Sequence, residues 1–320
     1  MTRSTRMLAF LLVTLMLLAT VSITGCQSGT PAVRIGVLPT EDSLPLWVAE
    51  KNGYFGKEGI SKVEIVEFQS AQERDAAFAS GAIDGFMGDI IAAANLTAAG
   101  KPNTIATVML GADKTQGRFG IAASRAASVT VLGQLADVPV GTSSATIQEY
   151  VLDELMSEAG VPTSSVKVTN IPKVPVRYQL LMAGKIKAAA LPEPFLSLAS
   201  QGGAKIVGDD TQARVNLSQT VLVFSNAFLN KEGGRATVAG VLRAWDSAVK
   251  EISMSSDPYR DLFVEKVKLP KELVTMYRVN TYPTHQLPAK ADVDPVLAWM
   301  KAKGYLKANV TYEQLVGKAK

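Results

Sequence analysis

From residue 33 onward, the hydrophobic and polar positions follow two alternating spacings. Short runs such as 33–38, which is mostly apolar, and 63–68, where apolar and acidic residues alternate, predict strands. Stretches with apolar residues four positions apart, as at Ile147, Val151 and Leu155, predict helices. We expect further strands at 83–87, 104–110, 119–123, 138–140, 166–171, 187–191, 205–207 and 220–224, helices between them, and a mainly helical segment after residue 230.

Prolines, glycines and capping residues mark the ends of the predicted helices. Pro45 suits the first turn of a helix that ends near Gly53, and Asp89 can cap a helix that reaches Gly100. Helices that alternate with strands are typical of α/β domains with parallel sheets. The pattern is compatible with two such sheets, although periodicity alone does not require two.

The N-terminal residues have the pattern of an export signal. Two arginines precede an uncharged apolar stretch, 7–23, which leads into Ile-Thr-Gly-Cys. This ending resembles the bacterial lipobox, in which the cysteine is diacylated and becomes the mature N-terminus. We therefore expect a lipoprotein signal peptide over 1–25, the lipid on Cys26 and a tether over 26–32. The alternative is an ordinary N-terminal membrane helix, because the apolar stretch nearly reaches spanning length.

Composition limits the classes of function. Hydrophobic residues make up 47% of the chain and charged residues 19%, which excludes wholesale disorder. Removal of 1–25 takes away two arginines and no acid, so a net charge of +4 falls to +2, too small an excess to predict nucleic-acid binding. With one cysteine and one histidine, the sequence predicts neither an internal disulfide nor a clustered metal site, and we expect no metal and no cofactor.

Polar loops of small residues are the features that recur. The sequence has no Walker A motif, no Gly-x-Gly-x-x-Gly and no Gly-x-Ser-x-Gly, which disfavours an enzyme. Loops at 39–43, 69–72 and 141–145 each follow a predicted strand and open a predicted helix. In open α/β sheets such loops lie where ligands bind, and the helix N-termini there favour anions. Each hydroxyl in these loops could equally be only a helix cap.

Three motifs resemble one family, and they occur in that family's order. The motifs are 44–55 (LPLWVAEKNGYF) with 58–60 (EGI), 80–85 (SGAIDG) with Gly88 and Asp89, and 190–195 (ALPEPF). They resemble periplasmic-binding-protein-like substrate-binding proteins of the nitrate, sulfonate and taurine (NMT1/THI5-like) family, a group that includes uptake of thiamine pyrimidine precursors. The resemblance covers most of 33–225.

The resemblance implies a two-lobed periplasmic-binding-protein-like type II fold. This is an α/β fold in which each lobe is a mostly parallel sheet flanked by helices, with the ligand in the cleft between the lobes. We expect lobe 1 at 33–115 plus 225–320 and lobe 2 at 116–224.

The resemblance also implies a role in uptake. We expect an exported monomer, anchored by lipid to the outer face of a bacterial cytoplasmic membrane or held in the periplasm or cell envelope. It would carry a small-molecule ligand to an ABC permease and its ATPase subunits, without catalysis and without nucleic acid.

The candidate ligand-binding residues lie in the loops at the strand ends. They are Thr40, Asp42, Ser43, Leu44, Gln69, Ser70, Gly88, Asp89, Thr142, Ser143, Ser144, Glu193 and Phe195. Asp89 could be only a helix cap, Glu193 only a solvated acid, and Phe195 only a core residue. Arg118 and Lys114, near an expected crossover between the lobes, could reach an anion.

Two ligand classes stay open at this point. Helix N-termini favour a sulfonate-like or nitrate-like anion. The loop acids Glu41, Asp42, Asp89 and Glu193 instead favour a ligand with N–H donors or a positive charge, such as an aminopyrimidine. Two other functions also stay open: a surface enzyme acting on a pyrimidine-like metabolite, and a ligand-sensing accessory protein.

Overall fold

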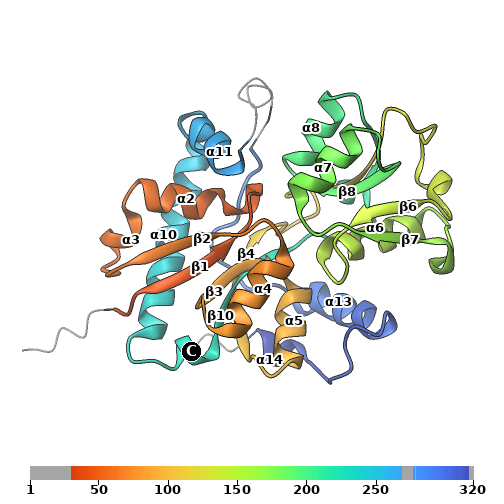
Figure 1. Cartoon of the computed structure of the whole chain (residues 1–320). Coiled ribbons are helices and arrows are strands. Elements are labelled where there is room, and N and C mark those ends of the chain that lie inside the picture. The colour runs from red at the N-terminus through yellow and green to blue at the C-terminus, as the bar shows by residue number, and fades with distance from the viewer. Residues whose placement is uncertain (1–29, 269–276, 278, 317–320) are drawn as a thin grey trace, which may run out of the picture.

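The strands form two five-stranded sheets, which lie side by side in Figure 1. The computed structural model describes residues 30–268, 277 and 279–316, so the predicted signal peptide and Cys26 lie outside it. The first sheet has the order β2-β1-β3-β10-β4 and contains β1 (Val33–Val37), β2 (Val63–Glu67), β3 (Gly85–Asp89), β4 (Asn103–Leu110) and β10 (Thr220–Ser225). The second has the order β7-β6-β8-β5-β9 and contains β5 (Phe119–Ala123), β6 (Pro139–Thr142), β7 (Lys167–Asn170), β8 (Ala188–Pro192) and β9 (Lys205–Asp209).

Each sheet is mostly parallel, as expected, and each contains one antiparallel strand. In the first sheet β10 runs antiparallel to its neighbours β3 and β4, and in the second β5 runs antiparallel to β8 and β9. These two strands are the ones that the chain enters after it crosses from the other sheet, once between β4 and β5 and once between β9 and β10.

The position of β10 corrects one predicted boundary. We expected 116–224 to form one unit, but Thr220–Ser225 pairs with strands of the first sheet. Phe224 lies opposite Gly85 of β3, where an added Cβ would come within 2.5 Å of the Phe224 ring. The apolar run correctly predicts a strand, but hydrophobicity does not specify which of two sheets it joins.

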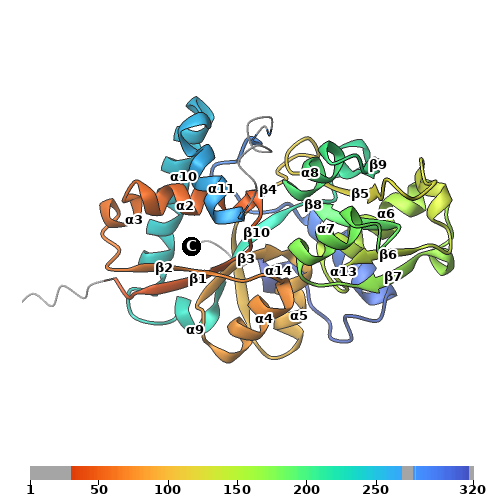
Figure 2. The same ribbon diagram turned by 45° about the horizontal axis from the view of Figure 1, so that its top comes forward.

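Helices cover both sheets (Figure 2). They are α2 (Leu44–Lys51), α3 (Tyr54–Lys57), α4 (Ala71–Ser80), α5 (Ile90–Ala98), α6 (Ile147–Glu158), α7 (Val174–Met182), α8 (Phe195–Gln201), α9 (Asn226–Leu229), α10 (Gly234–Met254), α11 (Arg260–Val267), α13 (Lys290–Ala302) and α14 (Tyr312–Leu315). The long helix α10 packs against α2 beside the first sheet, and Trp47 and Trp245 are fully buried there. Among the described residues, no helix combines the length and apolar character that a bilayer crossing requires.

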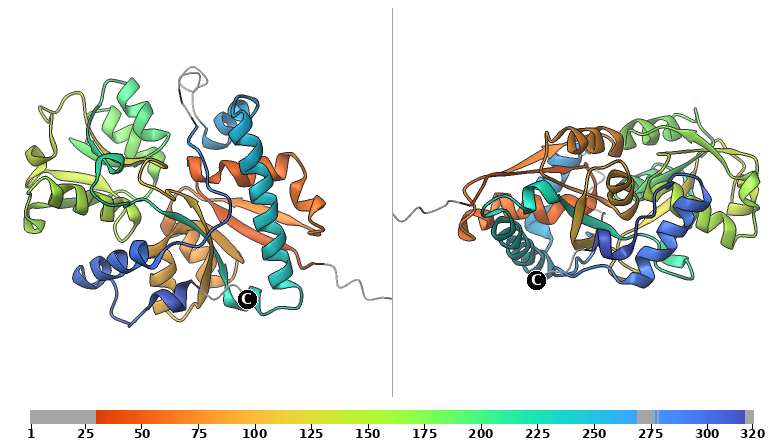
Figure 3. Two further views of the ribbon diagram at one scale, coloured as in Figure 1. Left: turned by 180° about the vertical axis from the view of Figure 1, so that it is seen from behind. Right: turned by 90° about the horizontal axis from the view of Figure 1, so that it is seen from below.

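Helix α13 contacts helices that belong to both sheets (Figure 3). It packs against α5, and its Trp299 ring meets the Tyr150 ring of α6 edge-on at 5.3 Å. Trp299 Nε1 also donates a hydrogen bond to Asp153 of α6 at 2.8 Å. The helix therefore joins a helix of the first sheet to a helix of the second.

The segment after residue 230 is helical only in part. Residues 279–289 have no regular secondary structure and run beside β4, where the Val108 backbone N–H donates to the Gln286 carbonyl at 2.8 Å. Pro283 and Pro288 lack the backbone N–H that a continuous helix would need.

Candidate functional site

A cavity lies between the two sheets. The empty space inside it, together with the open solvent at its mouth, amounts to about 600 Å³. Residues after β1 and at the end of β3 line it from the first sheet, and residues after β6 and at the end of β8 line it from the second. These are carboxyl ends of parallel strands, where ligands of open α/β sheets bind. The polar lining consists of Thr40, Glu41, Asp42, Arg74, Asp89, Arg118, Ser143, Thr146, Gln148, Glu193 and Thr220.

The structure brings some of the predicted residues to this cavity and not others. Those that line it are Thr40, Asp42, Gly88, Asp89, Ser143 and Glu193. Those that do not are Ser43, Leu44, Gln69, Ser70, Thr142, Ser144 and Phe195. The cavity is also lined by residues that were not predicted for the site. Arg118 was expected only to be able to reach an anion and Glu41 was named only as a loop acid, and the others are Arg74, Thr146, Gln148 and Thr220.

Four of the predicted residues that lie outside the cavity make hydrogen bonds within the protein. Ser43 Oγ donates to the Leu38 carbonyl at 2.9 Å, and Ser70 Oγ caps α4 by accepting from the Glu73 N–H at 3.2 Å. The backbone N–H of Gln69 donates to the Glu73 carboxylate, and that of Ser144 donates to the Asn170 side chain. Of these residues, Ser70 fulfils the helix-capping alternative that the sequence left open, whereas Ser43 has no side-chain capping bond.

The remaining three residues outside the cavity are buried. Leu44 is in the core, and Phe195 packs its ring against Tyr178 with the centroids 5.6 Å apart. Thr142 is fully buried, and its hydroxyl has no hydrogen-bond partner among the described residues.

Glu41 is a buried carboxyl held by residues from the far end of the chain. It accepts hydrogen bonds from the Tyr277 hydroxyl and from the backbone and side-chain nitrogens of Asn280, and the Tyr282 hydroxyl donates to its carbonyl at 2.9 Å. Burial raises the pKa of Glu41 to about 8, although the Tyr277 and Asn280 bonds counteract this. More than two hundred residues separate the partners, so no local pattern could reveal the contact.

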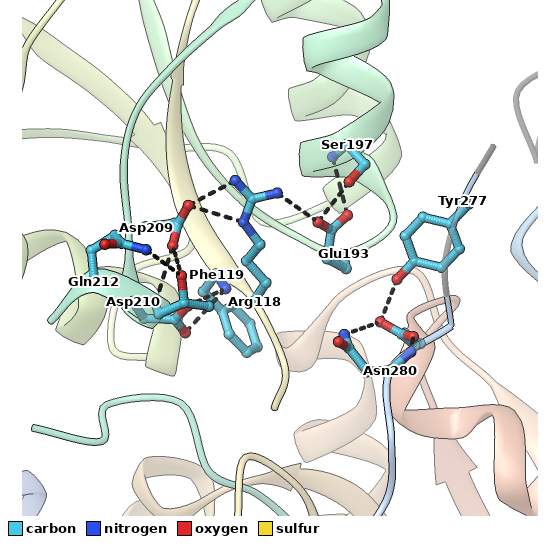
Figure 4. A network of polar contacts seen from close by, with 11 residues as sticks. Arg118, Phe119, Glu193, Ser197, Asp209, Asp210, Gln212, Tyr277 and Asn280 are labelled. Carbon is cyan, nitrogen blue, oxygen red and sulfur yellow. Dashed lines mark hydrogen bonds and ion pairs between the residues drawn. The ribbon is translucent and has the colours of Figure 1, made fainter. Parts of the chain in front are cut away.

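Glu193 is held by a network centred on Arg118 (Figure 4). Arg118 Nη1 lies 3.4 Å from Glu193 Oε1, while Nε and Nη2 donate to Asp209 at 2.9 and 2.7 Å. Glu193 also accepts from the Ser197 backbone N–H and hydroxyl, at 3.0 and 2.8 Å, near the start of α8. Burial raises the pKa of Glu193, and the Ser197 and Arg118 bonds limit the rise.

Asp210 holds the beginning of β5, directly after Arg118. Both of its carboxylate oxygens accept from the Phe119 N–H, at 3.0 and 3.1 Å, at the beginning of β5. Burial raises the pKa of Asp210 to about 7. Arg118 therefore enters the cavity from a backbone anchored one residue away.

Asp89 connects the two sides of the cavity. One oxygen caps α5 by accepting from the Ala92 N–H at 2.7 Å, and the other accepts from the Ile147 N–H in the first turn of α6 at 3.2 Å. Burial raises the pKa of Asp89, while the charge of Arg74 lowers it. Asp89 is thus both a helix cap and a lining residue.

Gly88 allows the guanidinium of Arg74 to reach the cavity. Arg74 lies over the Phe86 ring at 4.8 Å, and its Nη1 donates to the Met87 carbonyl at 2.8 Å. A Cβ on Gly88 would come within 2.7 Å of the Phe86 ring and 3.0 Å of Arg74 Cζ. A glycine is therefore required here by close approach.

The site has the chemistry of a small-molecule pocket. Among the described residues, no group of three or more histidine, cysteine or acidic side chains could hold a metal ion. Ser143, only 2% exposed, lines the cavity with a hydroxyl that lacks a hydrogen-bond partner within the described part of the chain. A buried hydroxyl without a partner is costly, and a polar ligand would satisfy it.

Solved structures with the same fold include binding proteins and an enzyme. The periplasmic aliphatic sulphonate binding protein SsuA from Escherichia coli has a TM-score of 0.73 and 19% identity, over 89% of this chain and 91% of that one. The periplasmic nitrate-binding protein NrtA from Synechocystis PCC 6803 has a TM-score of 0.70 and 14% identity, over 87% and 83%. The desulfurization enzyme DszB has a TM-score of 0.65 and 14% identity, over 89% and 96%.

Comparison at the level of sequence identifies the family. No protein of curated function matches the chain. The family model described as the NMT1-like family matches residues 27–260, most of the chain. The periplasmic-binding-protein fold and this match agree with the three motifs, and the chain belongs to the NMT1-like family.

Proposed function

We propose that the chain is a solute-binding protein that captures a small polar metabolite and delivers it to an ABC importer. One observation carries the proposal: the cavity is lined from both sheets, each of which supplies polar side chains, with Asp89 bonded to the first turn of α6 across it. A ligand there contacts both halves at once and stabilises their closed arrangement. In this proposal the permease recognises the closed form, and its ATPase subunits supply the energy.

The two halves follow from the sheets. Lobe 1 would consist of 33–115 with β10 and the residues after it, and lobe 2 of the segment from 116 to the second crossover. The halves would act as one monomer.

The proposed location depends on Cys26. Residues 1–25 would direct export, and a lipid on Cys26 would hold the protein at the outer face of the cytoplasmic membrane or within the cell envelope. Cys26→Ala should block lipid attachment, so the protein should leave the membrane fraction or remain unprocessed. An acylated Cys26→Ala product would contradict the assignment.

A thermal-shift screen tests the binding function. The panel contains nitrate, alkanesulfonates, amino acids, amines and pyrimidines, because a ligand that binds only the folded state raises the melting temperature. We expect one class to raise it in a saturable way with one ligand per chain. If no member of a broad panel does so, the proposed function is wrong.

A second experiment, on the compounds that bind in the screen, distinguishes binding from catalysis. DszB has this fold and is an enzyme, so the fold alone does not decide. Each compound that binds is incubated with the protein and analysed for new products. Recovery of the unchanged compound supports a binding protein, and product formation supports the alternative of a surface enzyme.

A further inference from the structure

The charges around the cavity favour a ligand that is not an anion. Four carboxyl groups line it, those of Glu41, Asp42, Asp89 and Glu193, against two guanidinium groups. Both guanidinium groups are already paired with other acids. Arg74 donates to Asp75 at 2.9 and 2.7 Å, and Arg118 donates to Asp209 at 2.9 and 2.7 Å. An oxyanion would therefore enter a pocket in which acidic groups outnumber guanidinium groups and both guanidinium groups already have acidic partners.

Four of the helix N-termini near the cavity carry one of the protein's own side chains as a hydrogen-bond acceptor. Ser70 caps α4, and Asp89 accepts from the first turns of both α5 and α6. Glu193 accepts from the Ser197 N–H in the first turn of α8. At these four helices an N–H group that would attract an anion is thus already partnered internally, whereas α7, whose Val174 also lines the cavity, has no side-chain cap.

Two of the carboxyl groups come from opposite sides of the cavity. Glu41 follows β1 of the first sheet, and Glu193 follows β8 of the second. Figure 4 shows the Glu193 carboxyl directed toward Ser197 and Arg118, while Tyr277 and Asn280, the residues that hold Glu41, come from the C-terminal segment beside it. Repulsion from Glu193 contributes to the raised pKa of Glu41, so the two groups act on each other across the gap.

Both carboxyl groups retain capacity for a further hydrogen bond. Glu41 accepts three from Tyr277 and Asn280, and Glu193 accepts three from Ser197 and Arg118. A carboxylate offers about four acceptor positions, so each has about one left. The unpartnered Ser143 hydroxyl gives the cavity a third polar group for a ligand.

We propose that the ligand carries a basic nitrogen group, a protonated amine or an amidine, that binds between the carboxylates of Glu41 and Glu193. This proposal rests on the proposed function of the same cavity. A cation between the two groups accepts no proton and instead makes charge-assisted hydrogen bonds to a carboxylate from each sheet, and it thereby favours closure.

The proposal predicts that protons are released when the ligand binds. Glu41 is faced by Tyr277 and Tyr282 from the C-terminal segment, by Glu193 with Arg118 from the second sheet, and by its neighbour Asp42. With a pKa of about 8, Glu41 is mostly protonated at neutral pH in the empty cavity. A bound cation lowers this pKa and expels the proton, whereas a bound anion would raise it and take up protons.

Matched probes of opposite charge test the proposal. Calorimetric titrations use benzamidine against benzenesulfonate and propylamine against propanesulfonate, at neutral pH in two buffers of different ionisation enthalpy. We expect a nitrogen compound of at least one pair to bind with release of protons, and its sulfonate counterpart to bind at least tenfold more weakly. Glu41→Gln and Glu193→Gln should each weaken that binding at least tenfold, and Glu232→Gln, at an exposed site, should not.

The outcomes separate this proposal from the proposed function. Tighter binding of a sulfonate, with proton uptake or unchanged affinity in Glu41→Gln and Glu193→Gln, overturns the basic-nitrogen ligand and leaves the solute-binding function in place. Failure of all four probes and of the wider screen overturns both. If either variant fails to fold, the sign of the proton exchange in the wild-type protein decides the question.

Discussion

The carboxyl of Glu41 makes the stability of the whole protein depend on pH. Its pKa is raised from 4.5 to about 8, so the folded state binds the proton more tightly than the unfolded state does. The resulting stabilisation is complete below about pH 4.5 and is lost as the pH rises through about 8. We expect Glu41→Gln to flatten this decline, which amounts to at most about 1.4 kcal/mol per pH unit, in urea unfolding measured across that range.

The control for this prediction is Glu232→Gln, at an exposed site. Asp210, whose pKa is raised to about 7, contributes a decline of the same sign, so the test is the difference between variant and wild type. An identical pH profile in Glu41→Gln and wild type would contradict the prediction.

Arg118 stabilises two carboxylates at once. Arg118→Met should leave Glu193 and Asp209 without their shared cation and lower the free energy of unfolding by about 2 kcal/mol, as for a lost charged hydrogen bond. Urea unfolding measures this loss, and Arg125→Met, at an exposed site, is the matched control. Equal stability of the two variants would show that Arg118 contributes nothing beyond a surface charge.

The candidate site was predictable where one loop supplies both position and chemistry. Asp89 ends β3, Ser143 directly follows β6, and Asp42 lies in the loop after β1, so strand ends and polar residues were enough to find them. Glu41 lies in the same loop as Asp42, yet its role depends on a hydrogen bond from Tyr277, 236 residues away. Arg74 lies on α4 and reaches the cavity because Gly88 leaves room, which depends on packing and not on periodicity.

At the scale of elements, the hydrophobic pattern located strands and helices well and their partners poorly. The expected strand at 83–87 is found at Gly85–Asp89, and the carboxylate of Asp84, just before it, accepts from the Arg34 backbone N–H and Nε at 3.0 and 3.1 Å. The pairing of β10 with the first sheet and the bridging position of α13 are long-range contacts. The hydrophobic pattern along the chain indicates that a segment is buried, but it does not indicate which other strand or helix the segment packs against.

Helix α13 gives a prediction at this scale. Lys303, just after it, lies 2.9 Å from both Glu149 and Asp153 of α6, which are buried. Lys303→Met should lower the free energy of unfolding by about 2 kcal/mol, because two buried acids lose their cation. Lys307→Met, at an exposed site, is the control, and urea unfolding is the measurement. A Lys303→Met protein as stable as the control would show that α13 is held by Trp299 and its apolar contacts alone.

For the whole molecule, function depends on how the halves meet. The same fold occurs in binding proteins and in an enzyme, so the cavity between the sheets and not the architecture carries specificity. Polar contacts across that region have opposite effects on closure. The Lys173–Glu73 ion pair, at 3.0 Å, and the Asp89 bond to Ile147 hold the halves together, whereas ionisation of Glu41 would set its charge against that of Glu193.

The Lys173–Glu73 pair allows a test of closure without a ligand. Lys173 precedes α7 beside the second sheet and Glu73 lies on α4 beside the first, and both side chains are about half exposed, so the pair contributes about 0.5 kcal/mol. Lys173→Glu should replace attraction with repulsion and shift the equilibrium toward the open form by about twofold or more. Combining Lys173→Glu with Glu73→Lys should restore the closed population, because the pair is then rebuilt with its charges exchanged.

Single-molecule energy transfer between dyes on the two halves measures this shift. Lys62→Cys and Ser164→Cys, both at exposed sites, carry the dyes in a Cys26→Ala background, so that no other cysteine reacts. High salt should reduce the effect of Lys173→Glu, since exposed charges are screened. Equal populations in the single and double variants, at low salt, would mean that this pair does not hold the halves together and that the Asp89 bond and the ligand alone govern closure.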